Sequence, residues 1–156
     1  MKRKILFSFC VALITFSMAA AQEIRTGEDG LFYTREGILF TGEIKENYPN
    51  GQLKIITMIS EGKIDGMVKI YFPNGVQNEI RSYQEGVMHG QWITWNEKGL
   101  KVAEANYTNG EKDGKWYVWN ENGILLYDMT YEKGRRAGTW KMFDESGKLV
   151  SEKEFD

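Results

Sequence analysis

The residues best suited to a binding role are aromatic side chains that recur at a fixed interval. Tyr71, Trp95, Trp119 and Phe143 are each 24 residues apart. Exposed Trp and Tyr side chains anchor many protein interfaces, and their rings can also stack on sugars. We therefore predict that part of this column contacts a partner. The alternative is that these rings only stabilise a sheet as cross-strand pairs.

Two further columns of mostly aromatic residues keep the same spacing. One consists of Val68, Trp92, Trp116 and Trp140. The other consists of Ile59, Tyr83, Tyr107, Tyr131 and Phe155. Each Trp of the first set lies two residues after a glycine, so we expect these Trp side chains to act as cross-strand stabilisers near a turn.

The polar residues do not form a chemical site that repeats. His89 is the single histidine, and its equivalents in the other units are Asp65, Asp113 and Ala137. A calcium site in every unit would need the same oxygen ligands each time. One Cys and one His also exclude most zinc sites and any intramolecular disulfide. We therefore predict ordinary turn residues and no metal.

Motifs of nucleophilic or phosphate chemistry are absent from the sequence. It contains no G-x-S-x-G elbow and no phosphate-binding glycine loop. The G-x-x-x-G segments are followed by strand-like rather than helical patterns, so they are not P-loops. We predict a protein that is not an enzyme and has no cofactor. The basic cluster Lys133, Arg135 and Arg136 is expected to be solvated, or else to contact acidic groups.

Size and charge limit the class of partner. The chain has 156 residues, 42% of them hydrophobic, which suits one globular domain. A formal net charge of −2 excludes a basic surface built for nucleic-acid phosphates.

The glycines show that the chain is a repeat with a period of 24. One series is Gly51, Gly75, Gly99, Gly123 and Gly147, and a second is Gly66, Gly90, Gly114 and Gly138. The repeat domain spans 27–156. It comprises a degenerate unit 27–50, full units 51–74, 75–98, 99–122 and 123–146, and a half unit 147–156. Terminal repeats that cap a repeat protein are often atypical, so the first unit is predicted to be a cap.

Each unit is predicted to be a β-hairpin. Asn-Gly pairs such as Asn122-Gly123 indicate tight turns with positive φ. A strand of about eight residues follows each, then a G-x-x-x-G connection such as 110–114, then a shorter strand. The structural turn glycines are therefore Gly51, Gly66, Gly75, Gly90, Gly99, Gly114, Gly123 and Gly138. The fold class is all-β: an elongated antiparallel meander of stacked hairpins with roughly eleven strands, near 50 Å long.

Both faces of this sheet are expected to carry aromatic rings. Trp92 and Trp95 are three residues apart, so alternation along a strand places them on opposite faces. The same holds for Trp116 and Trp119. We expect one aromatic ladder on each face, with curvature burying one and leaving the other partly open.

The unit Y-x-x-G-x-x-x-G-x-W-x-x-[YWF]-x-x-x-G resembles the MORN-repeat variant family. The segments 107–123 and 131–147 carry the pattern, and Phe40-Thr41-Gly42-Glu43 resembles the opening of such repeats. The resemblance implies a scaffold that contacts proteins or lipids, with no catalysis by the repeats. Many bacterial members are described as YwqK-like antitoxins, the neutralising half of a toxin–antitoxin pair.

The first residues resemble an export signal. Lys2, Arg3 and Lys4 precede the apolar run 5–18, and Ala19 to Ala21 fit a cleavage site. We predict a signal peptide 1–21, a short N-terminal segment 22–26, and a periplasmic or extracellular location. A membrane anchor is the alternative for this segment. Removing residues 1–21 takes three basic and no acidic residues, so the mature chain has a net charge of −5.

These features predict an exported repeat scaffold that binds another protein through its hairpin surface. The alternatives are an antitoxin or immunity-type protein, and a binder of lipid or glycan surfaces. The sequence indicates neither the partner nor the oligomeric state.

Overall fold

The computed structural model describes residues 23–156, and the predicted signal peptide 1–21 lies outside the described residues. Thirteen strands and no helix make up this part of the chain. The strands are β1 (Ile24–Thr26), β2 (Phe32–Thr34), β3 (Gly42–Asn47), β4 (Leu53–Ser60), β5 (Lys63–Tyr71), β6 (Gln77–Gln84), β7 (Val87–Trp95), β8 (Lys101–Thr108), β9 (Glu111–Lys112), β10 (Gly114–Trp119), β11 (Leu125–Glu132), β12 (Arg135–Phe143) and β13 (Leu149–Phe155).

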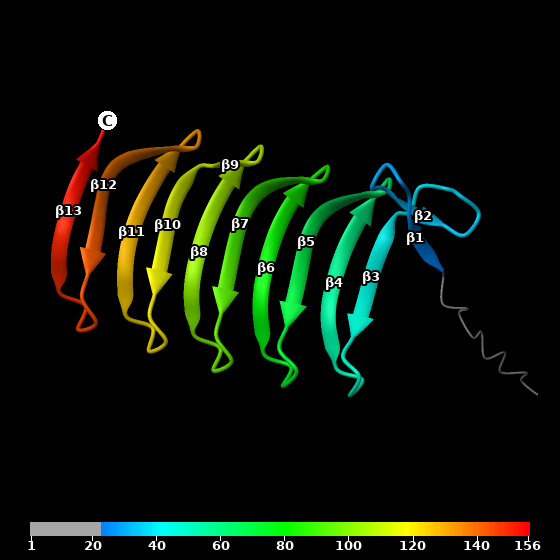
Figure 1. Cartoon of the computed structure of the whole chain (residues 1–156), viewed down its shortest axis with the longest axis horizontal. Helices are drawn as coiled ribbons and strands as arrows, with labels where there is room; N and C mark the ends of the chain where they lie inside the picture. The colour runs from blue at the N-terminus through cyan, green and yellow to red at the C-terminus, as the bar shows by residue number, and fades with distance from the viewer. Residues whose placement is uncertain (1–22) are drawn as a thin grey trace, which may run out of the picture.

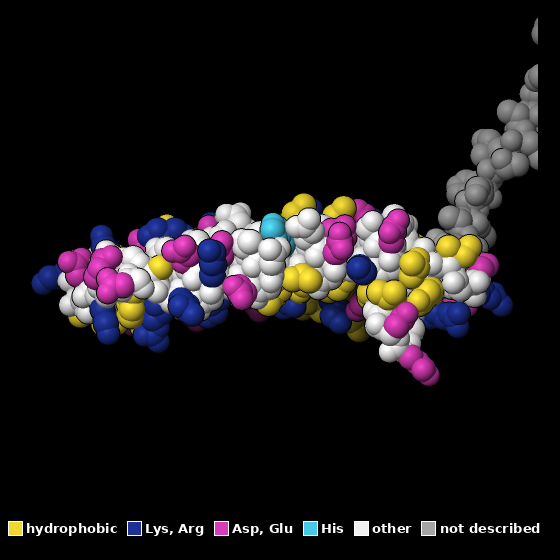
Figure 2. All heavy atoms as spheres, turned by 90° about the horizontal axis from the view of Figure 1, so that it is seen from above, with side chains coloured by type: hydrophobic (Ala, Val, Ile, Leu, Met, Phe, Trp, Pro, Cys, Tyr) yellow, Lys and Arg dark blue, Asp and Glu magenta, His cyan; other side chains and the backbone are white. Residues whose placement is uncertain are grey.

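Strands β3 to β13 form one antiparallel sheet in sequence order, so the predicted all-β meander is confirmed. The sheet has 11 strands, and the short β9 pairs with β8 beside the main path. It is elongated, with turns along its upper and lower edges (Figure 1). A view at right angles shows a slab only one sheet thick (Figure 2).

The upper edge in Figure 1 carries two-residue turns that the sequence analysis misplaced. Their central residues both have positive φ, as in Asn109 (51°) and Gly110 (84°), which is the geometry of a type I′ hairpin. The other turns of this kind are Glu61-Gly62, Glu85-Gly86 and Lys133-Gly134. Glu and Lys are weak signals for such a turn in three of the four units, whereas Asn109-Gly110 carries the strong Asn-Gly signal.

The second glycine of each G-x-x-x-G segment therefore lies beyond the turn, at a strand bulge. Gly66, Gly90, Gly114 and Gly138 have φ of 96°, 91°, 91° and 57°. Beside Gly66, three residues of β5 oppose Met58 alone in the pairing of β4 with β5. A glycine at a bulge lets the strand bend sharply, and Figure 1 shows this bend near the upper edge.

The lower edge carries the predicted Asn-Gly series in a different turn type. Gly51, Gly75, Gly99 and Gly123 have φ between 78° and 84°, but the residue before each has negative φ. In the 120–124 turn, the backbone N–H of Gly123 donates to the Asn120 carbonyl over 3.0 Å. This is a three-residue loop that ends in a left-handed glycine.

Adjacent units are joined by hydrogen bonds between their upper turns as well as by strand pairing. The backbone N–H of Gly110 donates to the Met88 carbonyl (2.8 Å), and that of Gly134 donates to the Lys112 carbonyl (2.8 Å). At the N-terminal end, the Phe40 carbonyl accepts the equivalent bond from Gly62 over 2.8 Å. The chain before β3 thus caps the sheet.

Dense packing is confined to this capped end. The buried hydrophobic residues of the described chain are Phe40, Ile59 and Val68, which are 4 to 7% exposed. Most other apolar side chains are half-buried, because within residues 23–156 no second layer covers either face of the sheet.

Candidate functional site: the two faces of the sheet

One face carries a continuous aromatic ladder in which two of the predicted columns interleave. The ladder consists of Tyr83, Trp92, Tyr107, Trp116, Tyr131, Trp140 and Phe155, and successive ring centroids are 5.0 to 5.8 Å apart. The rings are tilted or edge-to-face, which is the preferred geometry for aromatic pairs. We call the side of the sheet that bears these rings the ladder face.

The Trp residues of the ladder also hold the bulges together. The Trp116 indole N–H donates to the Asn106 carbonyl over 3.0 Å, and Trp92 and Trp140 make the equivalent bond to Ser82 and Thr130. Ser82 is the residue that the strand register skips at its bulge, and Thr130 directly follows Met129, the residue skipped at the equivalent bulge. The indole therefore supplies a donor where regular pairing is interrupted. Spacing alone could not reveal this role.

Cationic side chains lie over the ladder toward the C-terminal end. The Lys112 ammonium is 4.3 Å from the centroid of Trp116 and 4.8 Å from that of Tyr131. The Arg136 guanidinium is 4.9 Å from Trp140, and the Lys153 ammonium is 5.0 Å from Phe155. These are cation–π distances.

Burial within the ladder also changes the acidity of a tyrosine. Burial of the Tyr107 hydroxyl, and to a lesser extent the charges of Tyr131 and Tyr83, raises the pKa of Tyr107 above its ordinary value. This hydroxyl therefore stays protonated at neutral pH.

The column proposed from the sequence lies on the opposite face, beside the lower turns. Tyr71, Trp95, Trp119 and Phe143 are all half-buried. In residues 23–156 their rings do not contact one another, so the expected second ladder does not form. Members of this column lie two strands apart, too far for ring contact.

Trp119 illustrates the surroundings of that column. Its centroid is 5.6 Å from that of Tyr117, and the Lys101 ammonium lies 5.5 Å from its ring. Tyr117 is adjacent in sequence to Trp116, so these contacts confirm that Trp116 and Trp119 point to opposite faces.

His89 and the predicted turn acids act as local hydrogen-bond acceptors. His89 Nδ1 accepts from the backbone N–H of Asn109 over 3.4 Å, and Asp113 accepts from that of Lys133 over 3.3 Å. Thr41 does the same for Glu61 in the first unit. In residues 23–156, no cluster of three or more His, Cys, Asp or Glu side chains is arranged to hold a metal ion.

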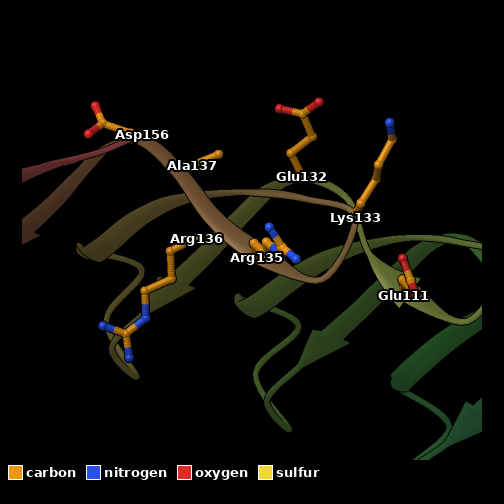
Figure 3. Close-up of a pocket in the computed structure, with 7 residues that line it drawn as sticks. All are labelled: Glu111, Glu132, Lys133, Arg135, Arg136, Ala137 and Asp156. Atoms are coloured by element: carbon orange, nitrogen blue, oxygen red, sulfur yellow. The ribbon is translucent and has the colours of Figure 1, made fainter.

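The basic cluster 133–136 divides between two surfaces. Lys133, Arg135 and Arg136 line an open groove of about 550 Å³ at the upper edge, together with Glu111, Glu132 and Asp156. Figure 3 shows Arg136 pointing to the other side of the strand, away from Glu132 and Asp156. The upper groove contains both acidic and basic side chains, so its charge does not indicate one class of ligand.

A second groove, of about 240 Å³, lies on the ladder face at the C-terminal end. Tyr127 and Met142 line it and are 39% and 37% exposed, although they are paired across β11 and β12. Sequence analysis missed both residues, because their equivalents in earlier units are smaller or charged and form no column.

The architecture and the repeated contacts define a protein built from stacked hairpin units. Comparison with protein families agrees: the model of the MORN repeat variant matches residues 40–58, 112–133 and 136–156. The chain therefore belongs to the MORN repeat variant family. The matched model describes the repeat, and the YwqK-like antitoxin subtype stays a prediction. No curated protein matches the chain significantly. No helix in residues 23–156 is long and apolar enough to cross a membrane.

Proposed function

We propose that this chain is an exported, non-enzymatic scaffold that binds another protein across its hairpin repeats. The observation that carries the proposal is the single-layer sheet, whose two broad faces are not covered by any other part of residues 23–156. Exposed apolar side chains on such a face are typical of a protein-contact surface. Export is proposed from the sequence pattern of residues 1–21.

Both faces expose large apolar side chains, including Met58 (38%) and Met67 (40%) on the face opposite the ladder, but the ladder face gathers its own in a groove. Its C-terminal end exposes Tyr127 and Met142 in a groove, whereas no residue of the Tyr71, Trp95, Trp119 and Phe143 column is an exposed large hydrophobic residue. Aromatic and Met side chains are enriched in the buried centres of protein interfaces. The ladder beneath the groove supplies a rigid base.

The test is capture of binding partners by purified 22–156 from envelope and secreted fractions, with cross-linking and quantification. Three proteins run in parallel: the unchanged chain, Tyr127→Ser/Met142→Ser, and Trp95→Ala/Trp119→Ala, each checked by circular dichroism. The proposal predicts a specific protein that is lost with the first pair of substitutions.

Loss with the second pair only would move the contact to the column predicted from the sequence. Retention on anionic liposomes or cell-wall glycan, with no protein captured, would refute protein binding. Capture of a toxin whose activity the chain neutralises would establish the antitoxin alternative.

A further inference from the structure

We propose that the C-terminal groove of the ladder face binds an acidic segment of a partner protein that also carries apolar side chains. This inference rests on the proposed function, because it names the site and the partner chemistry of the same scaffold.

The groove is apolar at its base and belongs to the last units alone. Tyr127, Met129, Trp140, Met142 and Phe155 line it, and they come from three adjacent strands, β11, β12 and β13. In the preceding unit, the positions of Tyr127, Met129 and Met142 hold Ala103, Ala105 and Val118. Large side chains therefore create walls here that the preceding unit lacks.

Charge on the ladder face changes along the chain from neutral to positive. In the earlier part, Arg81 lies 5.4 Å from the Trp92 ring, but Glu79 neutralises it in a 2.7 Å ion pair. The position that lies against the ladder in each unit holds, in order, Phe40, Ile64, Met88, Lys112 and Arg136. The first three are apolar, and the last two place a cation over the rings. Lys153 adds a third cation beside Phe155.

No carboxylate of β10 to β13 balances these cations on the same face. Asp128 pairs with Tyr117 and Lys141 across the strands, and Glu152 also pairs with Lys141. Alternation along each strand places Asp128, Glu132, Glu152 and Glu154 on the opposite side from Tyr127, Met142 and Phe155. The Asp128 carboxylate is already bound there by Lys115 at 2.7 Å.

The result is a local positive surface on a chain whose predicted mature form is negative overall. A carboxylate entering the groove would meet Arg136 and Lys153, and Arg can bind a carboxylate through two parallel hydrogen bonds. An apolar side chain beside that carboxylate would cover Tyr127 and Met142.

A peptide segment fits this surface better than a membrane does. The apolar side chains line a hollow rather than protrude, and the cations lie close against the rings, at 4.3 to 5.5 Å. A narrow chain can enter such a groove, whereas a flat bilayer needs projecting side chains to insert.

The test measures fluorescence anisotropy of a labelled peptide of alternating Glu and Phe residues with the mature chain. Matched peptides replace Glu with Gln or with Lys. Arg136→Gln/Lys153→Gln removes two cations from the groove, and Lys98→Glu is the charge control in a lower turn of another unit. We expect binding of the Glu peptide alone, weakened about tenfold by the double substitution and by added salt, and unchanged by Lys98→Glu.

Equal binding of the Glu and Gln peptides, or binding unaffected by the double substitution, would overturn the proposal. Binding of phosphatidylserine vesicles in place of the peptide would also overturn it. If the double variant fails to fold, Lys153→Gln on the edge strand β13 serves alone, with an expected loss of severalfold. A partner captured equally by the unchanged chain and by Arg136→Gln/Lys153→Gln would refute this groove and leave the protein-binding scaffold standing.

Discussion

Replacing Trp116 by Phe tests the contribution of a single interaction, the indole hydrogen bond at the strand bulge. Phe keeps an aromatic ring between Tyr107 and Tyr131, whose centroids lie 5.3 and 5.2 Å away. It removes the 3.0 Å bond to the Asn106 carbonyl. That carbonyl also accepts from the backbone N–H of Asp113 at 3.0 Å, so it is not left without a donor.

The expected cost of Trp116→Phe follows from these contacts. Loss of one hydrogen bond lowers the free energy of unfolding by about 1 kcal/mol. The smaller ring buries less apolar surface, which costs about 1 kcal/mol more. The melting temperature should therefore fall by roughly 6–10 °C.

The control is Trp119→Phe, which loses similar ring area but no indole hydrogen bond within the described residues. It should cost about half as much in free energy of unfolding. Urea titration followed by circular dichroism measures both. Equal destabilisation by the two substitutions would refute the role assigned to the indole N–H.

Three more predictions concern the turns, pH and export. Gly114→Val should lower the free energy of unfolding by about 2 kcal/mol, because its φ of 91° strains a β-branched residue, whereas Gly123→Asn (φ 80°, with open space around it) should cost less than about 1 kcal/mol. Equal urea midpoints for the two variants would contradict the assignment of Gly114 to a strained bulge. Hydrogen bonds from the Ser146 hydroxyl and then the Lys148 backbone N–H lower the pKa of Asp144 below its ordinary value of 3.8. The carboxylate is therefore stabilising at neutral pH, and this contribution is lost as the pH falls below about 4. In Asp144→Asn, which keeps the acceptor oxygen as Asn120 does, melting temperature should depend less on pH in that range; an unchanged profile would contradict this origin. N-terminal sequencing of the exported protein should begin at Gln22, and a start at Met1 would contradict cleavage.

The sequence predicts the hairpin units and their order, because a 24-residue period shows which residues are equivalent. It also predicts correctly that Trp116 and Trp119 point to opposite faces, since alternation follows from strand geometry alone. The turn assignments were less successful. Glu61 and Lys133 adopt positive φ although neither favours it, because the paired strands on both sides fix the two-residue loop.

The binding surface was harder to predict than the fold. A column shows that residues are equivalent but not which columns touch. The Tyr and Trp columns touch because the register places each Tyr opposite a bulge glycine, two residues before the Trp, as Tyr131 lies opposite Gly114. Tyr127 and Met142 form no column at all, since their groove occurs once. Features that occur once cannot be found from a period.

The hydrogen bonds between successive upper turns make every internal boundary between units alike. The bond from Gly110 to Met88 is repeated by the bond from Gly134 to Lys112. A tandem duplication of 24 residues would therefore add two strands without creating a new kind of junction. Each such step lengthens the molecule by about 10 Å. In this protein, the number of repeats thus sets the distance between the capped N-terminal end and the proposed groove at the C-terminal end.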